Sequence, residues 1–291
     1  MAELDADQAM LFGSIASQHT SEDPDAAADQ LQVCALNVYS PRRGRGQLLA
    51  DWLLATTADV LVLTEMQVSD GCHELLACLR AEGFTTTTSG PPAGGDKYFA
   101  ALATRGYTVS PLVAASLGPR VAAVDAATAA GPVRLVAIYA PSNGMTAESG
   151  NRRRCFQQQA LTYLRQIWCP AMLVAGDLNV VEPDHDPRLP AYADHDYGFY
   201  TGLLELGLRD AYRHHHPTGI DHSWLSARFG NQRIDHTLTG PGIGDIVSCG
   251  YDRTTIDAEL SDHAAMVTTI RLPTAPYSAA DDHATGAGAS Q

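Results

Sequence analysis

The chain has 291 residues, of which 45% are hydrophobic and 7% aromatic, so it can bury the core of one large domain or two small ones. Its formal net charge of −14 argues against a surface built to bind phosphates through Lys and Arg. However, residues 1–30 hold seven of the acidic residues and residues 274–291 hold two, which leaves 24 acidic and 19 basic residues in 31–273, a net charge of −5. Charge therefore excludes neither a nucleic-acid substrate nor a small anionic one.

Composition also limits the class of protein. The chain has no run of 18 apolar residues and no basic segment followed by an apolar one at its N-terminus, so we expect a soluble, cytoplasmic protein without a membrane partner. Its six cysteines form no C-x-x-C pair and are expected to be reduced. Residues 1–30 and 274–291 are predicted to be mobile tails around one domain of residues 31–273. The oligomeric state is left open, with a monomer favoured.

Two apolar runs in the first third of the chain end at a polar residue. Residues 31–36 alternate in polarity and predict a strand that ends at Asn37, which is equally a turn former or a functional residue. Residues 59–64 form a continuous apolar run typical of a buried strand, and Glu65 follows directly. A carboxylate there is costly to bury unless it is paired or binds a metal, which favours a functional role for Glu65. Helices are predicted at 47–58 and 73–82.

The middle of the chain reads as a run of strands separated by turn signals, which favours antiparallel pairing. These strands are predicted at residues 98–104, 107–114, 120–126 and 133–139. The last of them breaks at a turn that carries Tyr139 and Asn143. An amphipathic helix is predicted at 151–168, with three successive arginines in its first turns. The helix dipole disfavours cations there, so either an anionic ligand or acidic neighbours in the fold would account for Arg152, Arg153 and Arg154.

A second buried strand, residues 171–175, also ends in polar residues. The sequence Gly176-Asp177-Leu178-Asn179 follows it, and the glycine permits the backbone to turn sharply out of the sheet. The loop of residues 181–196 after it is rich in Asp and His, which could bind a metal, although acid-rich loops are common.

The C-terminal third holds three further signals. A helix is predicted at 199–206, and the three histidines His214, His215 and His216 are predicted to lie in an exposed polar loop. Short strands are predicted at 223–225 and 234–238, the second of which contains Asp235. The sequence Ser261-Asp262-His263 then stands directly before an apolar run that ends at residue 270.

The polar residues at these strand ends are expected to meet at one rim of a sheet. Oxygen ligands from Asn37, Glu65 and Asp262 describe a Mg²⁺ or Mn²⁺ site, because zinc would require clustered His or Cys.

The ordered set of motifs resembles the endonuclease/exonuclease/phosphatase family. The matching segments are Leu36-Asn37, Thr64-Glu65, Tyr139-Ala140-Pro141, Gly176-Asp177-Leu178-Asn179, Arg233-Ile234-Asp235-His236 and Ser261-Asp262-His263. The resemblance implies an α/β fold, a four-layer α/β sandwich in which two mixed, largely antiparallel sheets pack face to face with helices outside. Without it, the residues alone indicate only an α/β protein with much antiparallel sheet.

The resemblance also implies roles. Glu65, with Asn37 and Asp262, would hold the metal, and Asp177 would deprotonate the attacking water. Asn179, His263 and Tyr139 would donate hydrogen bonds to the phosphate, with Asp235 orienting His263. Further candidate contacts with the substrate phosphate are Asn143, Arg154 and Trp224.

Within the family, the layout is similar to exonuclease III and related abasic-site endonucleases. Two departures stand out: Gln67 occupies the position where those enzymes have a lysine, and Ser142 lengthens the turn before Asn143. The function expected is Mg²⁺-dependent hydrolysis of DNA, at abasic sites or 3′ ends. The alternatives are hydrolysis of a small phosphorylated metabolite, nucleotide or lipid head group, and a binding module that has kept the fold.

Overall fold

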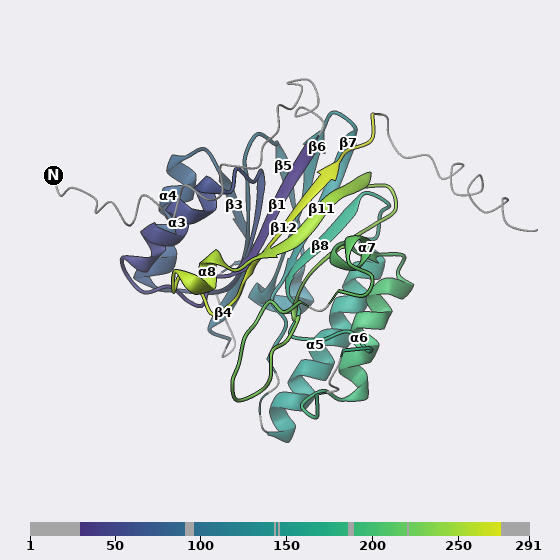
Figure 1. Cartoon of the computed structure of the whole chain (residues 1–291). Coiled ribbons are helices and arrows are strands. Elements are labelled where there is room, and N and C mark those ends of the chain that lie inside the picture. The colour runs from purple at the N-terminus through teal and green to yellow at the C-terminus, as the bar shows by residue number, and fades with distance from the viewer. Residues whose placement is uncertain are drawn as a thin grey trace, which may run out of the picture.

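The computed structural model describes residues 30–90, 96–142, 144, 146–185, 189–219 and 221–274 (Figure 1). The predicted tails lie outside these residues, apart from Gln30 and Thr274. Within the described part of the chain, no helix is both long and apolar enough to cross a membrane. All six cysteines are free thiols, as expected.

In the described part of the chain, twelve strands form two sheets of six. In order, the first sheet consists of β11 (Asp245–Asp252), β12 (Ala265–Arg271), β1 (Gln30–Asn37), β2 (Val60–Gln67), β4 (Tyr98–Thr104) and β3 (Thr85–Thr88). The second consists of β5 (Val109–Leu112), β6 (Val121–Thr128), β7 (Gly131–Ile138), β8 (Met172–Asp177), β10 (Asp235–Thr239) and β9 (Arg209–Asp210). The pairs β1–β2 and β7–β8 are parallel and the others antiparallel, so the predicted mixed, largely antiparallel sheets are confirmed.

The sheets pack face to face because their strands are apolar on both sides. Along β1, Val33 and Ala35 enter the core between the sheets, whereas Cys34 and Leu36 pack against the outer helices. Helices α3 (Arg45–Ala55) and α4 (Asp70–Ala81) cover the first sheet. Helices α5 (Ala147–Gln166) and α6 (Asp194–Glu205) cover the second, on the opposite side of the molecule (Figure 1). The predicted four-layer sandwich is therefore confirmed.

Several element boundaries differ from those predicted, because caps extend the helices. Helix α5 begins at Ala147 rather than at residue 151, since the Thr146 hydroxyl accepts a hydrogen bond from the Ser149 N–H. Helix α6 begins at Asp194 rather than at residue 199, and its Asp196 carboxylate accepts from the Ala193 N–H. A 3₁₀ helix η1 (Ala115–Arg120) precedes β6. The short helix α7 (Ala211–His215) follows β9, and the short helix α8 (Thr254–Asp257) follows β11.

The three histidines do not form the predicted loop. His214 and His215 end helix α7, and His216 caps it. All three are exposed, but the Nε2 atoms of His215 and His216 lie 2.8 and 3.0 Å from the carbonyl oxygens of Ile246 and Cys249 in β11. The prediction of a loop is wrong because an edge strand far along the chain supplies these acceptors.

A buried ionic network lies under β10. Arg233, only 1% exposed, donates to Glu182 Oε2 at 3.0 Å and to Asp210 Oδ2 at 2.9 Å. Arg213 Nε donates to the same Glu182 carboxylate at 2.6 Å. Because a buried guanidinium is costly without such partners, the network fixes the backbone that leads into Asp235, two residues after Arg233.

We expect Glu182→Gln to destabilise the fold in a pH-dependent way. Burial raises the pKa of Glu182, but the two arginines outweigh it and lower the pKa to about 2. The ionised carboxylate therefore adds about 3 kcal/mol to the free energy of unfolding above pH 4.5. This contribution is lost as the pH falls from 4.5 to 2. Urea unfolding of wild type and variant across this range measures it. The exposed Glu205→Gln is the control, and a difference that does not shrink with falling pH would contradict the prediction.

Candidate active site

The ends of three strands, β1, β8 and β10, bring polar side chains from both sheets together. Asn37 is the last residue of β1, and Asp177 is the last residue of β8, where it pairs directly with Asp235 of β10. The Asn37 Nδ2 atom donates to Asp177 Oδ2 at 2.9 Å across the interface between the sheets. The packing of the sandwich therefore fixes the position of Asp177.

Glu65 owes its orientation to an irregularity in β2. The register between β2 and β4 shifts between Leu63 and Met66, so one extra residue is accommodated there, and Glu65 has a φ of 55°. This left-handed conformation is strained for a residue with a side chain. Its Oε2 atom accepts hydrogen bonds from Asn37 Nδ2 at 3.2 Å and from the Tyr139 hydroxyl at 3.1 Å. Burial, followed by the charges of Asp177 and Glu65, raises the pKa of Tyr139 far above its ordinary value, so the phenol stays protonated.

A tight turn after β8 positions Asp177 and Asn179. Gly176 has a φ of 134°, and a Cβ atom there would lie 2.3 Å from the Ile138 carbonyl oxygen, so only glycine fits. Asn179 is left-handed, with a φ of 52°. Its N–H donates to Asp177 Oδ1 at 2.9 Å, and its Nδ2 atom donates to the Ala140 carbonyl oxygen at 2.9 Å.

Asp177, Asp235 and His263 form a buried cluster. Among the described residues, they are the one group of three His, Cys, Asp or Glu side chains with ligand atoms within 4.8 Å of one another. Burial, and then the facing Asp235 carboxylate, raise the pKa of Asp177 to about 8. Burial lowers the pKa of His263, but Asp235, Asp177 and Asp262 outweigh it and raise the pKa to about 10. His263 Nδ1 lies 2.7 Å from Asp235 Oδ2, so the imidazolium offsets the repulsion between the carboxylates.

Asp262 lies beside this cluster with one oxygen unsatisfied. Its Oδ2 atom accepts from Trp224 Nε1 at 3.2 Å. Its buried Oδ1 atom has no hydrogen-bond partner among the described residues, although His263 Nε2 lies 4.0 Å from it as an ion pair. The neighbouring Ser261 hydroxyl donates to the Asn37 carbonyl oxygen at 2.5 Å, which holds this loop against the end of β1. A carboxylate oxygen without a hydrogen-bond donor is the kind of ligand that a hard divalent cation takes, so Asp262 fits such an ion.

The other predicted residues lie in different surroundings. Asn37 directs its amide nitrogen at the two carboxylates, while its Oδ1 atom accepts from the Tyr39 N–H at 2.9 Å. Arg154 is exposed on α5 and donates to Asn151 Oδ1 at 3.2 Å. Asn143 lies outside the described residues. Gln67 donates to the Ser40 hydroxyl at 2.7 Å.

No role is predicted from the sequence for Ser223, yet it supports the cluster. Its buried hydroxyl accepts hydrogen bonds from the N–H groups of Ile234 and Asp235, both at 3.1 Å. Eleven and twelve residues separate these partners in the chain, so no local pattern marks the serine.

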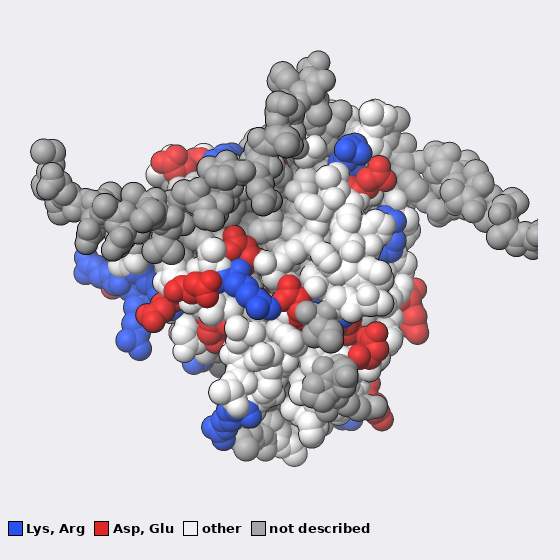
Figure 2. Space-filling view, viewed as in Figure 1, with Lys and Arg blue, Asp and Glu red and all other residues white. Residues whose placement is uncertain are grey.

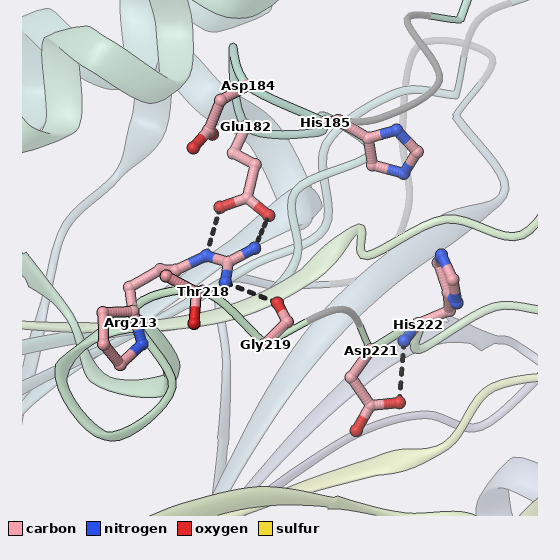
Figure 3. Close-up of a pocket in the computed structure, with 9 residues that line it drawn as sticks. Glu182, Asp184, His185, Arg213, Thr218, Gly219, Asp221 and His222 are labelled. Carbon is pink, nitrogen blue, oxygen red and sulfur yellow. Dashed lines mark hydrogen bonds and ion pairs between the residues drawn. The ribbon is translucent and has the colours of Figure 1, made fainter.

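A pocket of about 170 Å³ lies apart from the cluster, and its lining includes none of the predicted site residues (Figure 3). Arg213 is already paired with Glu182 there. Asp184 and His185, which belong to the acid-rich loop, point in different directions (Figure 3). Asp196 of the same loop is buried on the α5 side instead, where it binds Arg153. The described residues of this loop therefore form no metal site.

Comparisons with known proteins agree with this fold. The model of a family described as the endonuclease/exonuclease/phosphatase family matches residues 34–263. A comparison with curated proteins found no match. Among solved structures, an AP endonuclease from Archaeoglobus fulgidus is 21% identical, with a TM-score of 0.68 over 83% of this chain and 100% of that one.

Two further structures are similar. A 3′ phosphatase from Neisseria, bound to a product DNA hairpin, is 20% identical, with a TM-score of 0.66 over 82% of this chain and 98% of that one. An AP endonuclease from Leishmania major is 18% identical, with a TM-score of 0.67 over 93% of this chain and 100% of that one. At these identities the likeness shows a common fold.

We expect Gly176→Ala to destabilise the protein by about 3 kcal/mol, because it adds a backbone clash to an unfavourable φ. Gly83→Ala is the matched control: Gly83 also has a positive φ, of 85°, but its Cβ would meet nothing within 4 Å, so the cost should be about 1 kcal/mol. Chemical denaturation of both variants measures the difference. If both variants lose the same free energy of unfolding, the close approach of residue 176 to the Ile138 carbonyl oxygen does not destabilise Gly176→Ala.

Proposed function

The chain belongs to the endonuclease/exonuclease/phosphatase family and is a phosphoester hydrolase, and on that premise we propose that it is a Mg²⁺-dependent nuclease acting on DNA, at abasic sites or at 3′ ends. The observation that carries this proposal is the buried cluster of Asp177, Asp235 and His263. Asn37 connects it to Glu65 by donating to both Asp177 and Glu65, and Asp262 Oδ1 lies 4.0 Å from His263 Nε2.

Asp177 is the group that takes a proton from the attacking water. Both of its oxygens are fixed, Oδ1 by the Asn179 N–H and Oδ2 by Asn37 Nδ2, so its remaining lone pairs have a defined direction. Burial and the Asp235 carboxylate raise its pKa, which makes it a stronger base than an ordinary carboxylate once it is ionised.

His263 is the donor to the phosphate. Its raised pKa keeps the ring protonated at neutral pH, and Asp235 occupies Nδ1. Nε2 faces Asp262 Oδ1 at 4.0 Å, too far for a hydrogen bond, and can therefore donate to a phosphoryl oxygen as negative charge develops. The Asn179 side chain contributes a second donor. The Tyr139 hydroxyl is directed at Glu65, so its contacts support a role in orienting that carboxylate.

Glu65 and Asp262 would hold the divalent cation, with Asn37 positioning Glu65 through its amide nitrogen. The Asp262 Oδ1 atom, which has no hydrogen-bond partner among the described residues, supports this assignment. When bound, such a cation supplies positive charge beside a phosphoryl oxygen and the leaving oxygen.

The DNA substrate is supported by the solved structures with this fold, two of which are AP endonucleases and one of which was determined with a DNA product. A second candidate is hydrolysis of a small phosphorylated metabolite, nucleotide or lipid head group. Gln67 in place of a lysine, a single lysine in the whole chain, and the mixed charges on the face shown in Figure 2 favour it.

We expect the wild-type protein to cleave labelled duplex DNA that contains an abasic site or a nick when Mg²⁺ is present, and to stop when EDTA is added. Glu65→Ala should abolish cleavage, because it removes a carboxylate of the cation site. Asp177→Asn should lower kcat by about 10²- to 10⁴-fold, the usual contribution of a general base. The exposed Glu205→Ala is the control for expression and folding. Failure to cleave any DNA or RNA would contradict the proposal.

A panel of phosphomonoesters separates the two candidates. A strict phosphodiesterase should leave nucleotides, sugar phosphates and inositol phosphates intact under conditions in which it cleaves DNA. Release of inorganic phosphate from one of them, with no cleavage of DNA, would favour the small-substrate function instead.

A further inference from the structure

Arg153 is a fully buried cation on α5, unlike the two arginines beside it. Its side chain is 1% exposed, whereas Arg152 and Arg154 are exposed. A buried guanidinium is tolerated only when its donors are satisfied. Nε of Arg153 donates to Asp196 Oδ1 at 2.6 Å, and its guanidinium carbon lies 5.3 Å from the centre of the Tyr192 ring. Acidic neighbours in the fold therefore account for this arginine.

Another nitrogen of the Arg153 guanidinium contacts the candidate active site. Its Nη2 atom donates to the backbone carbonyl oxygen of Asn179 at 2.5 Å. Asn179 is left-handed, so its backbone is held where a residue with a side chain seldom lies. A hydrogen bond to its carbonyl oxygen opposes rotation of the following peptide back to an ordinary conformation. The same hydrogen bond anchors the backbone at Asn179. Without it the residue could shift, which would displace both the Asn179 N–H that binds Asp177 and the Asn179 side chain.

Asp196 holds the guanidinium from the other side. Its carboxylate, 2% exposed in the first turn of α6, also accepts from Gln157 Nε2 at 2.8 Å and from the Ala193 N–H at 2.9 Å. These bonds lock the carboxylate between α5 and α6. Arg153 is thus held at one end by two helices and presents its other end to the turn after β8.

We infer that Arg153, locked by Asp196, is a positioning residue that holds the Asn179 peptide so that Asp177 and the Asn179 side chain are aligned for phosphoester hydrolysis. This inference rests on the proposed function of the same site. A lysine cannot replace the arginine, because one ammonium group cannot reach a carboxylate and a carbonyl oxygen in the fixed geometry of a guanidinium fork.

Arg153→Lys is the main test, because it keeps a positive charge beside Asp196. We expect a folded protein whose kcat is about 10²-fold lower, with KM close to wild type, since small displacements of catalytic groups cost about this much. Arg165→Met, an exposed arginine on the same helix, is the control. The Asp196→Asn variant should lower kcat similarly, and combining it with Arg153→Lys should lower kcat little further.

A second measurement does not depend on activity. Hydrogen exchange of the Asn179 backbone N–H, followed by NMR in the substrate-free protein, should be faster in Arg153→Lys than in wild type and unchanged in Arg165→Met. If the wild type hydrolyses no phosphoester, the proposed function fails and this measurement alone tests the inference.

Two results would overturn the inference. One is wild-type kcat and wild-type Asn179 exchange in Arg153→Lys. The other is a loss of activity that only matches the fraction of unfolded protein measured by denaturation, with kcat per folded molecule unchanged, because that would make the arginine merely structural.

Discussion

Two buried carboxylates face each other across neighbouring strands, and the arrangement of the site follows from the need to accommodate them. Asp177 and Asp235 are direct partners in the β8–β10 ladder, where like charges repel. His263 offsets that repulsion with its imidazolium ring, and Asn37 donates to Asp177 from the other sheet. The Tyr251 hydroxyl further fixes the backbone by donating to the Asp235 carbonyl oxygen at 2.6 Å. Since these partners come from both sheets, the charges of the two carboxylates are balanced only when the sheets are packed together.

Much of this could be predicted from the sequence because the signals are local. A buried strand that ends at a polar residue is visible in a single chain, as at Glu65 and Asp177, and the carboxyl ends of such strands gather at one rim. The antiparallel pairing of β5, β6 and β7 followed from short strands separated by turns. The prediction is wrong for β4, the first strand of the same run, because it lies in the other sheet and does not pair with β5. The two-sheet sandwich itself came from the resemblance of ordered motifs, since periodicity alone indicates strands but not how many sheets they form.

What could not be predicted depends on partners far apart in the chain. The burial of Arg153 depends on Asp196, 43 residues away, and nothing local distinguishes it from Arg152 or Arg154. The left-handed backbone at Glu65 accompanies a register shift of β2 against β4, which no pattern within β2 reveals. The position of Gln67 is a further case: the sequence shows that a lysine is replaced, and only the structure shows that the amide binds Ser40.

The pairing of β1 with β12 has a consequence for synthesis on the ribosome. β1 is the first described strand and β12 the last, yet they are neighbours, with Gln30 opposite Arg271. Until β12 emerges, β1 presents an unpaired edge, and His263, which precedes β12, has not reached Asp235. Contacts of such long sequence separation form late in folding. A nascent chain therefore contains Asp177 and Asp235 before the histidine that offsets their repulsion has been made.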